Sequence, residues 1–355
     1  MRTVILSGSG SVAGLRELKS KRLFLVTDPY FAENGTAKRI GEASGAEAVE
    51  VFSEVSPDPS LTLAAKGADR FRKFRPDLLA ALGGGSALDL GKAIRYFGGR
   101  SVPFAAIPTT SGSGSEVTNF AILTHQGQKQ PLVDDSLQPD YAILDSDLLE
   151  KLPKPLIADA GFDVLSHALE AWVGKAAGEM SDLYGEKAFC MALSALPGSY
   201  AGDLSQRMPM HLAADFAGIA FSQAGLGLCH ALSHSLGARF HVPHGRLNSI
   251  LLPEVIEANS LGAGEKYALL ARRAGLGGSA QVLGVRNLKN TLIRLRRQLQ
   301  LPKTLAEAGI SPERLHSSLQ GIVEGTLQDP CCGTNPVPVT EAVVRQVLQR
   351  VAGHG

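Results

Sequence analysis

Short apolar runs alternate with helical stretches over the first 150 residues. The runs lie at residues 22–27, 48–52, 77–82, 102–107 and 141–144, and a further short run starts the chain. Most of them are apolar at consecutive positions, which is typical of strands covered on both faces of a sheet. Stretches with helical periodicity, such as residues 61–74, separate them. The pattern predicts a doubly wound, mostly parallel, Rossmann-like α/β sheet.

The pattern changes after Asp145. Long segments with helical periodicity follow, at residues 161–173, 180–196, 208–236, 250–259, 280–299 and 340–351. We find no convincing strand among them. Two prolines and two lysines interrupt the chain between Leu149 and Pro155. We therefore expect an α/β domain at residues 1–150 and an all-helical domain at residues 151–355.

Charge and composition argue against a nucleic acid or a membrane as a partner. The 35 lysines and arginines nearly balance the 34 aspartates and glutamates. A nucleic acid or an anionic membrane would require an excess of positive charge. The chain also lacks a long uncharged apolar segment and the apolar stretch of a signal peptide. We expect a cytoplasmic protein with no nucleic-acid partner and no membrane partner.

Two small-residue turns follow predicted strands. The first contains Gly83, Gly84 and Gly85 and leads into a helix, where the backbone can approach a ligand and free amides suit a phosphate. The second runs from Thr109 to Ser115 and is rich in hydroxyls. Each turn alone has an ordinary explanation, as a tight turn or a capped helix start. Together, at the ends of two parallel strands, they favour a dinucleotide.

Asp28 ends the first long strand, directly before a proline. A carboxylate in this position can accept hydrogen bonds from an adenosine ribose and would repel a 2′-phosphate, which favours NAD over NADP. An aspartate that starts a turn before proline is an equally common explanation.

Histidines are concentrated in the second half. Asp163 and His167 are four residues apart in a helical segment, as are His230 and His234, and His244 follows at a turn. A spacing of four places both members of a pair on one helix face. One carboxylate and three imidazoles would suit Fe²⁺ or Zn²⁺ and leave room for a substrate oxygen. His234 would then be free for proton transfer, while a lone helical histidine such as His241 is more often structural.

At these residues the sequence resembles the iron-containing (group III) alcohol dehydrogenase family. The motifs that carry the resemblance match in order and spacing; they are Gly83–Asp89, Pro108–Thr118, Gly161–Glu170, Gly227–Gly237 and Pro243–Gly245. Within the family the chain is most similar to the 1-propanol dehydrogenases of diol-utilising bacterial microcompartments. The resemblance implies a dehydroquinate synthase-like fold, a homodimer and packaging in such a compartment as an alternative to the open cytoplasm.

The resemblance also implies roles for individual positions. The implied metal ligands are Asp163, His167, His230 and His244, and the implied proton relay is His234. The implied contacts to NAD(H) are Asp28, Gly84, Gly85, Ser86, Asp89, Thr109, Thr110, Ser113, Thr118 and Leu148. The implied substrate-pocket residues are Phe120, Phe221 and Cys331. The activity implied is reversible hydride transfer between NAD(H) and a small primary alcohol or aldehyde such as propanol or propionaldehyde, with Fe²⁺, or alternatively Zn²⁺, as the metal.

Two other functions fit parts of the pattern. A dehydroquinate synthase-like or glycerol dehydrogenase-like enzyme of the same fold would act on a polyol or another polar substrate. A polyanionic substrate would require several basic residues near the metal, whereas the segments around His230 and His244 offer only Arg239 and Arg246. A non-catalytic nucleotide-binding protein would tolerate a damaged ligand set, and here the set is complete.

Overall fold

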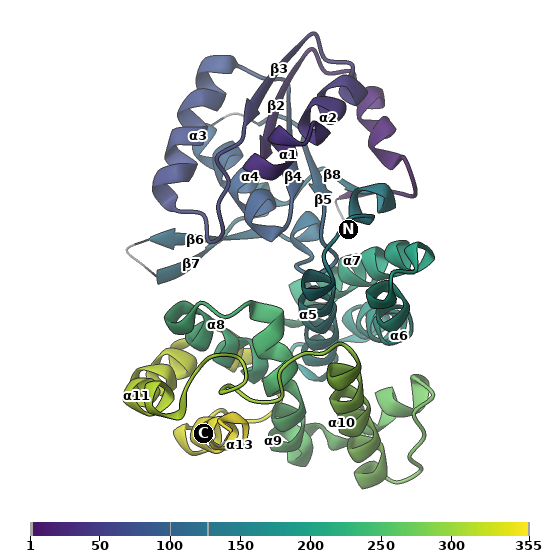
Figure 1. The fold of residues 1–355 in the computed structure, drawn as a ribbon, viewed down its shortest axis with the longest axis vertical. Helices are drawn as coiled ribbons and strands as arrows, with labels where there is room; N and C mark the ends of the chain where they lie inside the picture. Colours follow the sequence, from purple (N-terminus) through teal and green to yellow (C-terminus); the bar gives the residue numbers. More distant parts are fainter. Residues whose placement is uncertain (1–2, 100, 126–127, 354–355) are drawn as a thin grey trace. The chain divides into compact units, whose positions relative to one another are not determined.

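A computed structural model describes residues 3–99, 101–125 and 128–353 of the chain (Figure 1). The chain divides into two compact units, Met1–Leu152 and Pro153–Gly355. The division lies two residues beyond the boundary predicted at 150/151.

The first unit is built on a sheet of six parallel strands. The strands are β1 (Val4–Ser7), β2 (Arg22–Thr27), β3 (Ala48–Phe52), β4 (Leu78–Gly83), β5 (Phe104–Pro108) and β8 (Tyr141–Leu144). Their order across the sheet is β1-β8-β5-β4-β2-β3, and every pairing is parallel. The predicted apolar runs therefore correspond to strands of one parallel sheet.

The inner strands β2, β4 and β5 are buried on both faces, which explains why they are apolar at consecutive positions. Phe24 and Val26 of β2 face a core that includes residues of α3 (Leu61–Phe74) and α4 (Gly85–Gly98). Leu23 and Leu25 face a second core, formed with α2 (Thr36–Ser44) and a 3-10 helix at Ser11–Leu18. A shorter helix, α1 (Pro29–Glu33), follows β2.

A two-stranded antiparallel hairpin was not predicted. It consists of β6 (Phe120–His125) and β7 (Gln128–Val133). Ala121 and Leu123 are buried, while Phe120, Ile122 and Thr124 are partly exposed, so burial alternates along β6 as in a strand with one covered face. The alternation is short and mixes polar with apolar residues, which is why it does not stand out in the sequence.

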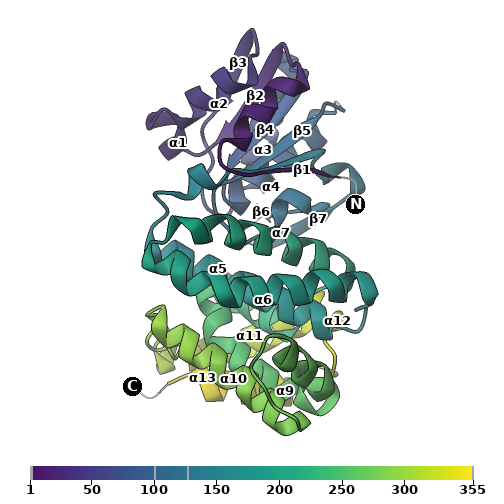
Figure 2. The ribbon, with the colours of Figure 1, turned by 90° about the vertical axis from the view of Figure 1, so that its right-hand side faces the viewer.

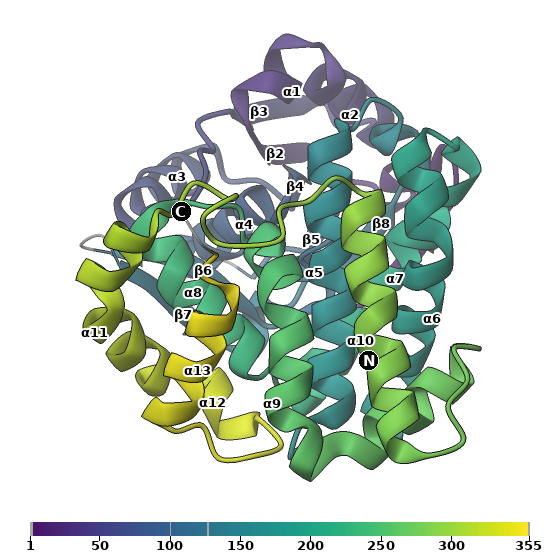
Figure 3. The same cartoon turned by 60° about the horizontal axis from the view of Figure 1, so that its bottom comes forward.

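Among the described residues of the second unit, all regular elements are helices. Its helices are α5 (Lys154–Val173), α6 (Glu179–Ala201), α7 (Arg207–Ala224), α8 (Leu228–Phe240), α9 (His244–Arg273), α10 (Gln281–Gln298), α11 (Pro312–Gln328), α12 (Cys331–Thr334) and α13 (Glu341–Val351). Helix α5 is buried on nearly all sides and packs against α6, α7 and α9 (Figures 2 and 3). The prediction of an all-helical second half is confirmed, although α11 was not anticipated.

The prediction of one continuous helix over residues 208–236 is wrong. Helices α7 and α8 meet at an angle of 104° across a short break. Gly225 in this break has a left-handed φ of 73°, and a Cβ there would lie 2.7 Å from Thr334. The break places His230 in the first turn of α8, where the helix begins anew.

Membrane-spanning potential is confined to this bent pair of helices. In the described part of the chain, no single helix is long and apolar enough to cross a membrane, and the bent pair passes such a test on length and composition alone.

Candidate active site

The predicted cofactor residues of the first unit follow the carboxyl ends of four neighbouring strands. Asp28 follows β2, Gly84 follows β4, Thr109 follows β5 and Leu148 follows β8. The chain runs from β2 outward to β3 and then returns to β4 on the other side of β2. Such a reversal of strand order is where parallel α/β sheets bind ligands.

The two small-residue turns lie against each other. The amide of Thr109 donates to the carbonyl of Gly83 at 3.0 Å. A Cβ on Gly84 would lie 3.3 Å from Thr110 Oγ1, and a Cβ on Gly85 would lie 3.1 Å from Ser113. Among the described residues, no side chain caps the start of α4, so its first amides, up to Ser86, are available to an anion. The arrangement fits a dinucleotide phosphate.

Asp89 and Thr118, both predicted to contact the cofactor, are engaged within the protein. Asp89 accepts hydrogen bonds from Ser115 Oγ at 2.6 Å and from the amide of Ile122 at 2.9 Å. Lys92 donates to Thr118 Oγ1 at 2.9 Å. Asp89 and Lys92 therefore hold the second turn in place, and direct contact of Asp89 or Thr118 with a cofactor stays a prediction.

Lys92 and Glu116 were not identified from the sequence. Both are buried, with 0% and 1% of their surface exposed. Burial lowers the pKa of Lys92 to about 8, although Asp89 and Glu116 oppose this shift. Burial raises the pKa of Glu116 to about 7, against the opposing effect of Lys92. The spacing of Asp89 and Lys92, three residues apart on a helix, was the available signal.

Asp28 caps α1. Its Oδ1 accepts a hydrogen bond from the amide of Phe31 at 3.0 Å. Oδ2 lies 3.7 Å from the place where Gly83 would carry a Cβ, so the carboxylate stands beside the first glycine turn. Asp28 therefore has the turn-forming role, and its preference for NAD over NADP stays a prediction.

The four predicted metal ligands converge in the second unit. Asp163 and His167 lie on α5, His230 on α8 and His244 at the start of α9. From Asp163 Oδ1, the Nε2 atoms of His167, His230 and His244 are 3.9, 3.7 and 3.7 Å away. Two ligands of a tetrahedral ion, each about 2.1 Å from it, lie about 3.4 Å apart. Ligand atoms of Asp163, His167 and His230 all lie within 4.8 Å of one another and fit a divalent ion, and His244 Nε2 adjoins them through its approach to Asp163.

The protonation of Asp163 and His167 suits a metal, whereas, against the opposing effect of burial, Asp163 and Glu170 raise the pKa of His230 to about 9. Burial, reinforced by the charge of His230, lowers the pKa of His167 to about 4. Burial would raise the pKa of Asp163, but the surrounding histidines hold it well below its usual value. An ionised carboxylate and a neutral imidazole are the forms that bind a divalent ion.

Glu170 is a functional residue to which the sequence alone assigned no role. It is 3% exposed and accepts hydrogen bonds from the amides of Gly227 at 2.9 Å and Cys229 at 2.6 Å, at the start of α8. Its Oε2 is also 2.6 Å from His230 Nδ1. Glu170 thereby orients His230 so that Nε2 faces Asp163, as carboxylates behind metal-binding histidines commonly do.

Asn248 is a second residue that was not predicted. Its Nδ2 donates to Asp163 Oδ1 at 2.8 Å and to Ser166 Oγ at 2.9 Å. Asn248 lies one helical turn after His244 on α9, so one helix supplies a predicted ligand and a group that fixes another ligand. The four-residue spacing of the two was the available signal.

The start of α9 approaches α5 very closely. A Cβ on Gly245 would lie 1.9 Å from the carbonyl oxygen of Asp159. Arg246 donates to both oxygens of Asp159, at 3.2 and 2.9 Å. The absent side chain of Gly245 and this ion pair bring His244 within reach of Asp163.

His234 and His241 have different surroundings from the predicted ligands. His234 Nδ1 is 2.8 Å from Asp329 Oδ2, and the His234 ring stacks on that of His244 with centroids 5.1 Å apart. His241 is exposed and ends α8 with a left-handed φ of 55°. His234 thus adjoins the site, while His241 serves as a helix end.

The three predicted pocket residues are divided between the units. Phe221 is buried, and its ring centroid is 4.5 Å from that of His167. Cys331 lies beside His234 and Asp329, with potential ligand atoms of the three within 4.8 Å of one another. Phe120, in the first unit, begins β6 and lies beneath Lys92. Phe221 and Cys331 therefore adjoin the histidine cluster, as expected for a pocket.

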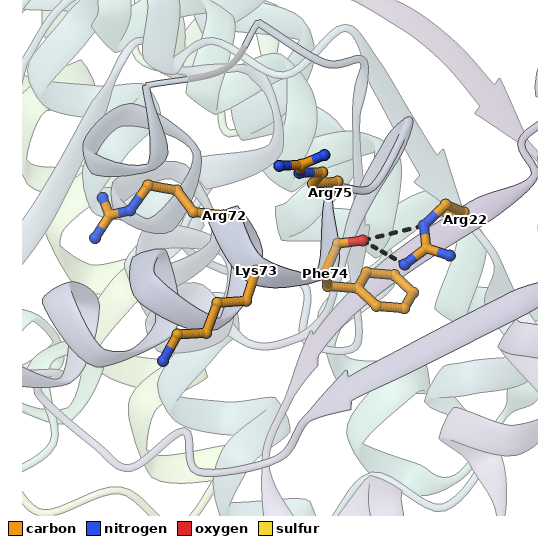
Figure 4. A pocket seen from close by; sticks show the side chains of 5 residues that line it. All are labelled: Arg22, Arg72, Lys73, Phe74 and Arg75. Carbon is orange, nitrogen blue, oxygen red and sulfur yellow. Dashed lines mark hydrogen bonds between the residues drawn. The ribbon is translucent and has the colours of Figure 1, made fainter.

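A shallow depression of about 630 Å³ lies elsewhere in the first unit (Figure 4). It is lined by Arg22, Arg72, Lys73, Phe74 and Arg75. Arg22 donates to the carbonyl of Phe74, and Lys73 pairs with Asp69 at 2.7 Å. These cations complement the C-terminal end of α3 and lie at the amino ends of the strands, away from the small-residue turns.

Comparison with known protein families agrees with this geometry. Residues 3–146 match the model of the family described as "Iron-containing alcohol dehydrogenase". Residues 157–352 match the model described as "Fe-containing alcohol dehydrogenase family, C-terminal". The chain belongs to the iron-containing alcohol dehydrogenase family. The resemblance inferred from the motifs is thereby confirmed.

Relatives within the iron-containing alcohol dehydrogenases match nearly the whole chain. An NADPH-dependent butanol dehydrogenase of Clostridium saccharobutylicum is 36% identical over 98% of this chain and 96% of its own length. The 1-propanol dehydrogenase PduQ of Salmonella typhimurium is 35% identical over 99% of this chain and 98% of its own length. The crystal structure of a sulfoacetaldehyde reductase of Bifidobacterium kashiwanohense in complex with NAD⁺ superposes with a TM-score of 0.89, at 26% identity over 100% of this chain and 98% of that chain.

The alternative functions are not favoured. The relatives are alcohol dehydrogenases and an aldehyde reductase, which supports an oxidoreductase. The two arginines near the histidine motifs lie against other parts of the protein. Arg246 is paired with Asp159, and Arg239 packs so closely on α11 that a Cβ on Gly321 would clash with it.

Proposed function

We propose that this iron-containing alcohol dehydrogenase interconverts a small primary alcohol and its aldehyde with NAD(H), using a divalent ion held by Asp163, His167, His230 and His244. The convergence of three imidazole Nε2 atoms on one oxygen of Asp163 carries the proposal. Fe²⁺ is the ion that the family name favours, and Zn²⁺ suits the same donors. When bound, the dinucleotide supplies or accepts the hydride and the ion polarises the substrate oxygen.

Residues of the chain bind the cofactor, line the substrate pocket and transfer the proton. The amides at the start of α4 and the hydroxyls of Thr109, Thr110 and Ser113 bind and align the dinucleotide. Phe221, packed on His167, covers an apolar side of the substrate pocket and excludes water. His234 carries the proton that must leave an alcohol or reach an aldehyde oxygen. Its side chain is 36% exposed, so it can exchange that proton with solvent.

The preference between NADH and NADPH rests on Asp28. Its carboxylate stands beside the Gly83 turn, where it would accept hydrogen bonds from a ribose and repel a 2′-phosphate. One relative is named NADPH-dependent and another was crystallised with NAD⁺, so family membership alone does not fix the preference. We propose NAD(H) for this chain on the position of Asp28.

We further propose that the enzyme is a homodimer, which rests on family resemblance. Light scattering of the purified protein tests this directly, and a mass of one chain, 37.3 kDa, would contradict it.

Turnover with a panel of small aldehydes, followed at the absorbance of the reduced nicotinamide, tests the activity. Enzyme stripped of metal and reloaded with Fe²⁺ or Zn²⁺ is assayed with NADH and with NADPH. We expect turnover only after reloading and a higher kcat/KM with NADH. The absence of turnover with every aldehyde, in every metal form, would contradict the proposal.

Asp163→Ala tests the ligand assignment. Loss of this carboxylate should abolish stoichiometric metal binding and lower kcat by at least about a thousandfold, since a bound ion contributes several kcal/mol to catalysis. Affinity for NADH should stay unchanged. Asp182→Ala, which removes a carboxylate paired with Lys266 elsewhere on the second unit, is the matched control. Full metal content in Asp163→Ala, measured by elemental analysis, would show that the ion is held elsewhere.

A further inference from the structure

His234 and Asp329 form a hydrogen-bonded pair beside the predicted metal ligands. The two atoms that meet are His234 Nδ1 and Asp329 Oδ2, 2.8 Å apart. Asp329 directly follows α11, so the two groups come from segments about ninety-five residues apart in the chain. The other ring nitrogen, Nε2, neither accepts nor donates a hydrogen bond among the described residues.

Asp329 is itself held firmly. Its Oδ1 accepts a hydrogen bond from the amide of Cys331 at 2.9 Å. Its own amide donates to the carbonyl of Thr326, in the last turn of α11. The side chain is 13% exposed, and Pro330 restricts the backbone that follows. One oxygen is therefore fixed by the backbone, and the other is presented to His234.

This pairing selects one form of the His234 ring. An ionised carboxylate can only accept hydrogen bonds, so the proton of a neutral imidazole is drawn to Nδ1. Nε2 is then left with a free lone pair and can receive a proton. A group that takes a proton from an alcohol needs this form.

A second pair on the same helix serves as an internal comparison. His230, one turn earlier on α8, presents Nδ1 to Glu170 at 2.6 Å. That pair is almost fully buried, with exposed fractions of 1% and 3%, whereas His234 is 36% exposed. The same carboxylate–imidazole contact thus occurs once at a predicted metal ligand and once at a solvent-accessible ring.

We infer that Asp329 is a positioning residue that fixes the orientation and tautomer of His234 for proton transfer. This inference rests on the proposed function, because His234 needs a defined tautomer only if it relays a proton. Asp329 acts through His234 and requires no contact with substrate or cofactor.

Asp329→Asn, Asp329→Glu, His234→Ala and the double variant His234→Ala/Asp329→Asn test the inference in the metal-loaded enzyme. Asparagine would donate to Nδ1 and leave the proton on Nε2, which blocks that atom as an acceptor. We expect Asp329→Asn to lower kcat about 10- to 100-fold, with metal content, NADH affinity and aldehyde KM near those of the wild type. Asp329→Glu should recover part of the loss. Asp182→Asn is the matched control.

The double variant separates an indirect from an independent role. If Asp329 acts through His234, the double variant is no slower than His234→Ala. An unchanged kcat in Asp329→Asn, a further loss in the double variant, or loss of metal from Asp329→Asn would overturn the inference. An unchanged kcat in His234→Ala would instead overturn the proposed relay itself.

A measurement on the wild-type protein keeps the inference testable if the Asp329 variants fail to fold. The enzyme loaded with Zn²⁺ and labelled with ¹⁵N-histidine gives the tautomer of each ring by NMR, and the His234 signals are identified by their absence from His234→Ala or His234→Gln. We expect the proton on Nδ1 of His234. A proton on Nε2 with a bare Nδ1 would overturn the inference.

Discussion

The two units build their proposed sites from different kinds of chemical group. The first uses backbone amides and small hydroxyls at the ends of β2, β4, β5 and β8, and the space is kept by absent side chains, as at Gly84 and Gly85. The second uses ionisable side chains from α5, α8 and α9, which further carboxylates and amides hold in position. A change in the first unit should therefore act by added bulk, and a change in the second by a lost ligand or lost orientation.

Gly245→Ala should have the largest effect of the variants that test this difference, because it adds a side chain where two helices of the second unit approach most closely. A Cβ 1.9 Å from the Asp159 carbonyl forces α9 away from α5. We expect loss of metal, at least about a hundredfold lower kcat, and about 1–3 kcal/mol less stability. Elemental analysis, turnover and thermal unfolding measure these effects. Gly237→Ala is the control, because its Cβ would come no closer than 3.7 Å to another atom; equal metal content in both variants would contradict the close approach.

Gly85→Ala should have a smaller effect, confined to the first unit. The added Cβ would lie 3.1 Å from Ser113, so the two turns must separate by a few tenths of an ångström. We expect the Kd for NADH, measured by fluorescence titration, to rise about tenfold while metal content stays unchanged. In the control Gly41→Ala the nearest atom, on Val49, would be 3.4 Å away. Weaker metal binding in Gly85→Ala would contradict the proposal that the first unit binds the cofactor and the second unit binds the metal.

Asp28→Asn tests the effect of the negative charge alone at the carboxyl end of β2. Asparagine keeps an oxygen to cap α1 but removes the negative charge. We expect the ratio of kcat/KM for NADPH to that for NADH to rise about fivefold, chiefly through KM for NADPH. An unchanged ratio would mean that Asp28 serves only as the helix cap.

Glu116→Gln should change pH dependence while leaving stability at low pH nearly unaltered. The folded protein raises the pKa of Glu116 from 4.5 to about 7, so between these values the folded state keeps a proton that the unfolded state releases. Stability from this group therefore falls as pH rises through that window. We expect the variant to lose this slope, on the order of 1 kcal/mol between about pH 5 and pH 7 in urea unfolding. The same slope in both proteins would contradict the assignment.

Much of the fold could be predicted because it depends on local patterns. Strands buried on both faces must be apolar at consecutive positions, and this made β2, β4, β5 and β8 recognisable. The hairpin β6–β7 escaped notice because it is short and half exposed. The break between α7 and α8 also escaped notice, since it depends on the crowding of Gly225 by Thr334, which lies more than a hundred residues away in the chain.

The sequence by itself indicated the donor types of the proposed metal site and a separate role for His234. One helical turn aligns Asp163 with His167 and His230 with His234, and the motifs imply different roles for the last two. Only the tertiary structure decided which carboxylate holds each of these two rings. Glu170 reaches the first and Asp329 the second, each from a distant segment, and their burial differs. Contacts of this kind leave no periodic trace in a sequence, since they depend on how whole helices pack.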